Sequence, residues 1–506
     1  MTLGPLTDAV AHATDEALAG VPRIWARDHT WWADDPTELA DRLGWLEAPE
    51  RAVAASADLV ARAGQVRADG ITDVVVVGMG GATLYPRVLA STFGSGPGAP
   101  RLHVLDSTDP AAVLGIERSV PWERTLVVPA SKSGGSIETL SFLDRFEARL
   151  AAVHGEAAGR YVLPITDPGS PLARRAGDRG YRGPALGQPD VGGRFSALTA
   201  FGLLPAALLG LDPAEHVASA REMLAVTRHT QAEGNAPAVL GAVLAAGVRT
   251  GRDKMALLVP DEIASFGLWI EQLIAESIGK HGVGIVPVLG ETPANAHVGD
   301  DRFVVAIGEH PEVADLLAAG VPVVQLPWTS PAQLAGEVIR WEFATAVAGG
   351  LLGMNPFDQP NVQAAKTATD RVLASGADLP ATADPDEVLA SLRPGDLLGL
   401  LAFVVPDGGD EARVRAWADR LRASTGVPVT VGIGPRYLHS TGQLHKGGSD
   451  RAAFLLLVGD DPEDVEIPGR PYGFSRLKRA QAAGDLDALR AAGRRVEYVS
   501  LDAVAG

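Results

Sequence analysis

The chain has 506 residues, of which 46% are hydrophobic and 21% charged, with a formal net charge of −18 and no cysteine. This length corresponds to about three domains of roughly 150 residues each, and the acidity argues against general nucleic-acid binding, which needs a basic face. The lack of cysteine excludes disulfides, thiolate catalysis and iron–sulfur clusters.

The N-terminal residues have no basic segment followed by an apolar run, which argues against a signal peptide. Residues 195–211 come closest to a membrane helix, but their number and their glycine and proline residues favour a buried helix. We therefore expect a cytoplasmic protein with no membrane partner. Residues 1–50 are predicted to be a helical segment, with Trp31 and Trp32 in the core or at a subunit interface.

Apolar runs of strand length then alternate with helical stretches. The first four runs are 71–78, 102–106, 125–131 and 161–166. Near-continuous apolar strands between helices are typical of a parallel sheet that is covered on both faces. The pattern predicts a first doubly wound domain over residues 51–225.

The same pattern restarts further along the chain. The next four apolar runs are 254–260, 284–290, 302–308 and 322–328, and a last set is 397–405, 427–433, 452–458 and 496–501. They predict a second doubly wound domain over 226–380 and a smaller C-terminal α/β unit over 381–506. The Pro- and Asp-rich stretch 376–387 is predicted to be a linker or long loop. The fold class is therefore α/β, with two consecutive three-layer domains and an extension.

A glycine turn follows the first strand. Gly78, Gly80 and Gly81 allow a tight turn and expose backbone N–H groups at a helix N-terminus, where an anion is favoured. Asp106 at the end of the next strand suggests a dinucleotide site, but that fingerprint needs Gly or Ala where this chain has Thr83. A purely structural turn is the alternative.

A second turn, residues 131–136, has the sequence SKSGGS between a strand and a helix. Three hydroxyls, backbone amides and an ammonium at a helix N-terminus can hold a dianion without a metal. The alternative is that Ser136 only caps the helix and Lys132 is solvated. Arginine replaces lysine readily on a surface, but not where a compact ammonium meets a phosphate or carries a proton. The chain has only six lysines, and four lie in short segments rich in Gly, Ser, His or Gln: Lys132, Lys280, Lys366 and Lys446.

The two turns together resemble the sugar isomerase (SIS) domain, and in particular the phosphoglucose isomerase family. A strand followed by G-x-G-G-x and, some 50 residues later, S-K-S-G-x-[ST]-x-E-T carries the resemblance. It implies that the second loop holds the phosphate of a sugar phosphate and that the first loop contacts the substrate. The residues concerned are Gly80, Gly81, Ser131, Lys132, Ser133 and Ser136. The family normally has serine where this chain has Ala82, with Thr83 as the neighbouring hydroxyl.

Residues 266–282 are predicted to form an amphipathic helix that ends at Gly279. Gln272 and Glu276 are four apart and share a face, and by periodicity alone Glu276 is more readily explained by an exposed i,i+4 pair with Lys280. The segment E-Q-L-x-x-E-S-x-G-K, however, resembles the family signature. That resemblance implies that Glu276 is the base of an aldose–ketose isomerisation, with Gln272 in the same site.

Two further segments match the family. In D-V-G-G-R-F-S, Arg194 is implied to stabilise an enediolate, since a preorganised guanidinium can meet developing negative charge; by itself it is more readily structural. In F-D-Q-P-N-V-Q-A-A-K, Gln359 is implied to contact phosphate and Lys366 to lie at the ring oxygen, the alternative being a solvated lysine.

A histidine that opens the sugar ring has no clear counterpart at the family's usual place between the base and the late lysine. That interval contains only His281, His297 and His310, none in the expected G-x-H context. Residues 434–448 instead resemble the isomerase half of bifunctional transaldolase–phosphoglucose isomerases. We expect His439 to open the ring, with His445 as the second candidate. The alternative for either histidine is a structural role.

The resemblance therefore implies a metal-independent and cofactor-independent isomerase of glucose 6-phosphate and fructose 6-phosphate, and a homodimer with shared active sites. Its partner is a small sugar phosphate and not nucleic acid. Alternatives are the same chemistry on another sugar with a C6 anion, motivated by Ala82, a non-catalytic sugar-phosphate sensor, and a nucleotide-linked oxidoreductase, which Thr83 disfavours.

Overall fold

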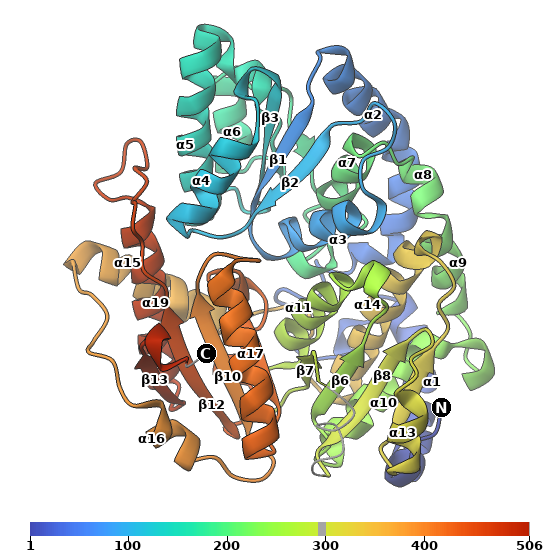
Figure 1. Ribbon diagram of the computed structural model, residues 1–506. Helices are drawn as coiled ribbons and strands as arrows, with labels where there is room; N and C mark the ends of the chain where they lie inside the picture. Colours follow the sequence, from blue (N-terminus) through green and yellow to red (C-terminus); the bar gives the residue numbers. More distant parts are fainter. Residues whose placement is uncertain (292–299, 505–506) are drawn as a thin grey trace.

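The computed structural model describes residues 1–291 and 300–504 and contains three parallel sheets (Figure 1). The first sheet has the order β2-β1-β3-β4-β5. Its strands are β1 (Asp73–Gly78), β2 (Arg101–Leu105), β3 (Thr125–Ala130), β4 (Ile165–Thr166) and β5 (Ala185–Leu186). The helices that precede the second sheet in the chain are α1 (Thr7–Trp25), α2 (Ala48–Ala68), α3 (Leu84–Phe93), α4 (Pro110–Ser119), α5 (Ile137–His154), α6 (Pro171–Asp178), α7 (Ala200–Leu208), α8 (Pro213–His216), α9 (Ala218–Val226) and α10 (Ala236–Arg249).

The valine run of β1 explains why helices cover both faces of this sheet. Successive strand residues point to opposite faces. Val74 and Val76 accordingly belong to one core cluster, with side chains of α2, α3 and α7, whereas Val75 and Val77 belong to another, with side chains of α4 and α5. Full burial of each valine stabilises the fold by about 1.5 to 3 kcal/mol.

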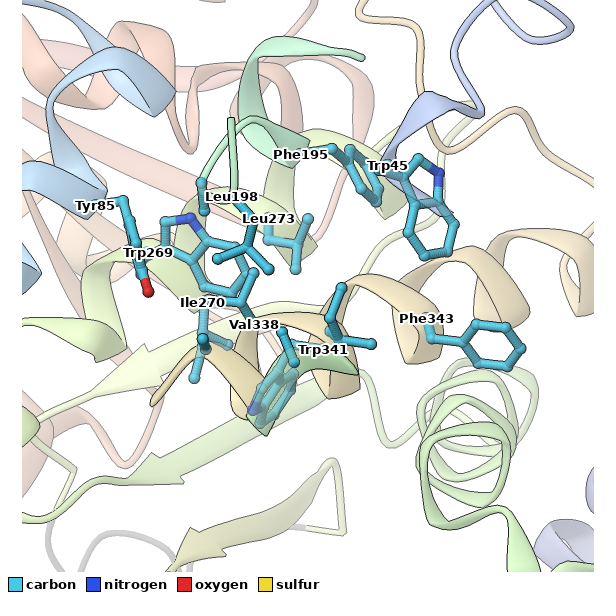
Figure 2. Close-up of a cluster of buried hydrophobic side chains, with 14 of the residues drawn as sticks. Trp45, Tyr85, Phe195, Leu198, Trp269, Ile270, Leu273, Val338, Trp341 and Phe343 are labelled. Carbon is cyan, nitrogen blue, oxygen red and sulfur yellow. The ribbon is translucent and has the colours of Figure 1, made fainter. Parts of the chain in front are cut away.

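The second sheet has the order β7-β6-β8-β9 and shares its main core with the first. Its elements are β6 (Lys254–Leu258), α11 (Phe266–Ile278), β7 (Val286–Leu289), β8 (Arg302–Ile307), α13 (Val313–Ala318), β9 (Val323–Leu326), α14 (Leu334–Leu351) and α15 (Val362–Ser375). Figure 2 shows part of this common core, in which Trp45 lies beside Phe195 and Tyr85 beside Trp269.

The C-terminal unit is built around the third sheet, with the order β11-β10-β12-β13. Its elements are α16 (Pro385–Ala390), β10 (Leu397–Phe403), α17 (Gly409–Thr425), β11 (Val429–Ile433), α18 (Gly442–Gly447), β12 (Ala452–Val458), α19 (Phe474–Ala491) and β13 (Arg495–Val499). This unit lies below the first sheet and beside the second in Figure 1, and α15 packs along α19. The short 3-10 turn η11 (Arg436–His439) follows β11.

The predicted fold class is confirmed, and the structure adds local detail. In the run 161–166 only the last two residues form a strand, because a 3-10 turn occupies Gly155–Tyr161 and Val162 makes just an isolated bridge. The stretch 376–387 has no regular secondary structure until Asp384 caps α16. Trp32 is buried, as expected. The boundaries at 50, 225 and 380 remain predictions. No helix in residues 1–291 and 300–504 has the length and hydropathy to cross a membrane.

Candidate active site

A polar cavity of about 380 Å³ opens where the strand order of the first sheet reverses, beyond the carboxyl ends of β1 and β3. Ligands of open α/β sheets bind at such switch points. The parts of the chain around the first sheet, the second sheet and the C-terminal sheet all contribute residues to this cavity. The predicted site residues that line the cavity are Gly80, Gly81, Ser131, Lys132, Ser133, Ser136, Arg194, Gln272, Glu276, Gln359, Lys366 and His439.

The carboxylate of Glu276 is held at both oxygens on the last turn of α11. Its Oε1 lies 3.2 Å from Nη1 of Arg194, and its Oε2 accepts a hydrogen bond of 3.0 Å from Nε2 of Gln272. Gln272 Nε2 also donates to the His439 carbonyl at 2.8 Å. The i,i+4 spacing on α11 thus brings Gln272 and Glu276 into contact at the cavity. The side chain of Glu276 is only 10% exposed.

Arg194 is buried and uses all its remaining donors. Nε donates to Ser277 Oγ at 2.7 Å, and Nη2 donates to the carbonyls of Pro356 and Asp358. Nη1 donates to Gln359 Oε1 at 2.8 Å. Burial lowers the pKa of Arg194, an effect that Glu276 and Asp358 oppose.

The interpretation of Glu276 and Lys280 as an exposed i,i+4 pair is wrong. Lys280 pairs instead with the carboxylate of Asp358 and also donates to the carbonyl of Asn355 at 2.6 Å. Its side chain is 1% exposed, and burial together with Arg194 lowers the pKa of Lys280 to about 8 against the pull of Asp358. Lys280 therefore tethers the segment that carries Gln359.

The turn after β1 requires glycine because backbone atoms of other segments approach it closely. A Cβ on Gly81 would lie 2.0 Å from the carbonyl oxygen of Gly193, the residue before Arg194. Gly80 has φ +55°, and a Cβ there would lie 2.7 Å from the carbonyl oxygen of His439. Thr83 does not replace the hydroxyl missing at Ala82, because it is fully buried and donates to the Gly80 carbonyl.

Loop 131–136 leads into a helix N-terminus whose first backbone amides are available to bind an anion. Ser136 is the N-cap of α5, but its hydroxyl makes no capping bond and instead lies 3.1 Å from Ser131 Oγ. The interpretation of Ser136 as a simple cap is therefore wrong, and the first amides of α5 have no side-chain cap. Lys132 is not solvated either, since it donates to Asp167 Oδ2 and to the Gln188 carbonyl, which leaves one of its three protons for a ligand.

His439 reaches the cavity from η11. Its Nε2 lies 2.9 Å from Oε1 of Glu138, which also accepts a hydrogen bond of 2.8 Å from Gln481. Burial raises the pKa of Glu138, but His439 and Lys366 outweigh it and lower the pKa, so the carboxylate accepts both bonds. A second cavity of about 190 Å³ lies against Lys366 and His439 as well.

His445 does not line the main cavity. It is 4% exposed and packs between the rings of Tyr437 and Phe454, and burial holds its pKa well below the usual range. His281 is exposed, and His310 bonds to the carbonyl of Ile307. His297 lies outside the described residues.

Sequence reasoning did not single out Glu138 and Asp358. Glu138 is the glutamate of the S-K-S-G-x-[ST]-x-E-T motif, and Asp358 directly precedes Gln359, so the motifs contained both without indicating their partners. Among residues 1–291 and 300–504, no group of three His, Asp or Glu side chains could hold a metal ion.

The parallel sheets and the polar cavity at their carboxyl ends define an α/β protein that binds a small ligand at the switch point of a parallel sheet. A family model described as phosphoglucose isomerase matches residues 58–287. A glucose-6-phosphate isomerase of Rubrobacter xylanophilus is 33% identical over 391 residues, which are 66% of this chain and 89% of the relative. The chain belongs to the phosphoglucose isomerase family.

Solved structures are similar in fold. A hypothetical protein of Thermus thermophilus is 27% identical, with a TM-score of 0.61 over 73% of this chain and 97% of that one. A glucose-6-phosphate isomerase of Chlamydia trachomatis is 18% identical, with a TM-score of 0.60 over 72% of this chain and 86% of that one, and shares the fold.

Proposed function

We propose that this chain interconverts glucose 6-phosphate and fructose 6-phosphate, the activity for which its relatives are named. The observation that carries the proposal is the carboxylate of Glu276, fixed by Arg194 and Gln272 in a cavity that also contains the loop 131–136. A proton shuttle needs one carboxylate in a fixed position beside the substrate.

In this mechanism the hydroxyls of loop 131–136, the amides of α5 and the free proton of Lys132 bind the phosphate. His439, oriented by Glu138, and Lys366 take the proton from the C1 hydroxyl and supply one to O5, so that the C1–O5 bond breaks and C1 becomes the aldehyde. Glu276 then removes the proton from C2 of the aldose and returns it to C1, and the proton of the C2 hydroxyl moves to O1. Arg194 stabilises the enediolate between these steps, with Nη1 exchanging the exposed Gln359 for a substrate oxygen.

Specific contacts in the structure argue against two of the alternative functions. A nucleotide-linked enzyme needs a free acidic group for ribose hydroxyls, but both oxygens of Asp106 accept hydrogen bonds from Arg436. A sensor needs no buried base paired with an arginine. Another C6-anionic sugar remains the second candidate because Ala82 offers no hydroxyl to the cavity.

A homodimer in the cytoplasm is part of the proposal and rests on the family resemblance. The expected sharing of active sites is not needed for the histidine, because His439 enters the cavity from the same chain. Sedimentation velocity at several concentrations tests the dimer, and a monomer at all of them would contradict it.

The test of function is a coupled assay in chelator with glucose 6-phosphate, comparing wild type with Glu276→Gln. We expect turnover by the wild type and a loss of about 10²- to 10⁴-fold in the variant. Rates with other 6-phosphosugars and with a 6-sulfo sugar separate the two substrate classes. A folded wild type that turns over none of them would contradict the proposal.

A further inference from the structure

Asp106 forms a buried two-point ion pair between the first sheet and the C-terminal unit. It follows β2, is 1% exposed, and accepts hydrogen bonds of 2.8 Å from both Nε and Nη2 of Arg436. Arg87 adds a third contact at 3.1 Å. Burial raises the pKa of Asp106, but the two guanidinium groups outweigh it and lower the pKa to about 2. The carboxylate is therefore charged and bound from both sides.

Arg436 is the first residue of η11, and His439 is the last. The turn is thus fixed at both ends. Asp106 holds the first residue, whereas Gln272 holds the His439 carbonyl and Glu138 its ring. A 3-10 turn rises about 2 Å per residue, so Arg436 and His439 lie only about 6 Å apart along one hydrogen-bonded turn, and the position of Arg436 bears on the backbone that carries the imidazole.

Three residues after Asp106, another contact joins the same units, but through α19 and not through the histidine turn. Asp109 accepts a hydrogen bond of 2.9 Å from Lys478. Lys478 has a further acidic partner in Asp461, so its charge stays paired without Asp109. Asp109 also caps α4 by accepting from the Ala111 amide, a bond that asparagine can keep, so Asp109→Asn is a matched control for a contact between the units.

We propose that Asp106 is a positioning residue for ring opening: through Arg436 it sets the turn that presents His439 to the substrate, a role that rests on the proposed function of His439. Asp106 does not line the cavity, and its effect passes through the histidine turn.

A double-mutant cycle tests this role, with kcat and KM for glucose 6-phosphate measured in the full-length chain. We expect Asp106→Asn to lower kcat by about 10- to 100-fold with KM within roughly threefold, since misplacement by 1 Å can cost that much. His439→Ala should lower kcat by about 100-fold. The double variant should be within roughly threefold of His439→Ala, because residues that act on one step are not additive.

Two further variants separate positioning from simple attachment. Arg436→Lys keeps the charge but not the two-point geometry, so its kcat should fall between wild type and Asp106→Asn, and it replaces Asp106→Asn in the cycle if that variant does not fold. Asp109→Asn should lower the melting temperature while kcat stays within about threefold of wild type.

Losses that multiply in the double variant, or an equal loss of kcat in Asp109→Asn, would overturn the positioning role and leave the isomerase function intact. Full activity of His439→Ala would overturn it as well, and Glu276→Gln would still report on the proton shuttle. An inactive, folded wild type would instead overturn the proposed function itself, and the positioning role with it.

Discussion

The carboxylate of Glu276 lies 3.2 Å from the guanidinium of Arg194, and both side chains are almost completely buried. Two charges withdrawn from water need a partner and further hydrogen bonds to be tolerated. Gln272 supplies one to the carboxylate, and Ser277, Gln359 and two carbonyls satisfy the arginine. A pair fixed in this way at the wall of a cavity is suited to a reaction in which negative charge develops on a neighbouring oxygen.

Replacement of Arg194 should therefore impair turnover more than substrate binding. We expect Arg194→Met to lower kcat by about 10²- to 10³-fold, because a preorganised donor to the enediolate is lost. Arg194→Lys should recover only part of this, since an ammonium cannot reproduce the planar set of donors. Steady-state kinetics on folded protein, checked by circular dichroism, measures both, and wild-type kcat in Arg194→Met would contradict the assignment.

The two histidines of the C-terminal unit should differ in kind. His439→Ala should lower kcat by about 100-fold with little change in the melting temperature. His445→Ala should lower the melting temperature by several degrees because it leaves a hole between Tyr437 and Phe454, while kcat of the folded protein stays within about threefold. The reverse pattern in paired kinetic and thermal measurements would assign ring opening to His445.

Gly81 should be intolerant of any side chain. A Cβ there would lie 2.0 Å from the Gly193 carbonyl, so Gly81→Ala must displace the turn that precedes Arg194. We expect a loss of more than about 2 kcal/mol in the free energy of unfolding, measured in urea. Gly135→Ala is the control, since a Cβ at Gly135 meets no atom within 4 Å; an equal loss there would contradict the explanation.

Acid should remove the contribution of Asp106. Its pKa of about 2 in the folded chain is below the unfolded value of about 3.9, so the unfolded state binds more protons between these values. The stabilisation is present above pH ~4 and is lost progressively as the pH falls through ~2, about 2 to 3 kcal/mol in all. Unfolding of wild type and Asp106→Asn between pH 6 and 2 should show a difference that shrinks on acidification; a constant difference would contradict it.

Local patterns in the sequence were sufficient for the fold class and for most of the cavity wall. Apolar runs that alternate with helices predicted the parallel sheets, and the glycine at 279 marked the end of α11. The few lysines also marked segments that line or support the cavity, although most of these lysines form structural ion pairs and do not face the cavity. Five of the six lysines form ion pairs in buried or half-buried positions, and Lys366 alone is exposed, at the cavity.

The partners of these residues were decided only by the tertiary structure. Periodicity favoured Lys280 as the partner of Glu276, but the folded chain gives Lys280 to Asp358 and Glu276 to Arg194. Glu138 and His439 lie in segments 301 residues apart, and the sequence motif around each says nothing about the other. Spacing rules act over one or two helical turns, whereas a charged side chain pairs with whichever group the packing of distant elements brings within reach. The sequence by itself therefore determined the elements and the candidate chemistry, and the packing of three sheets around one cavity determined which groups act together.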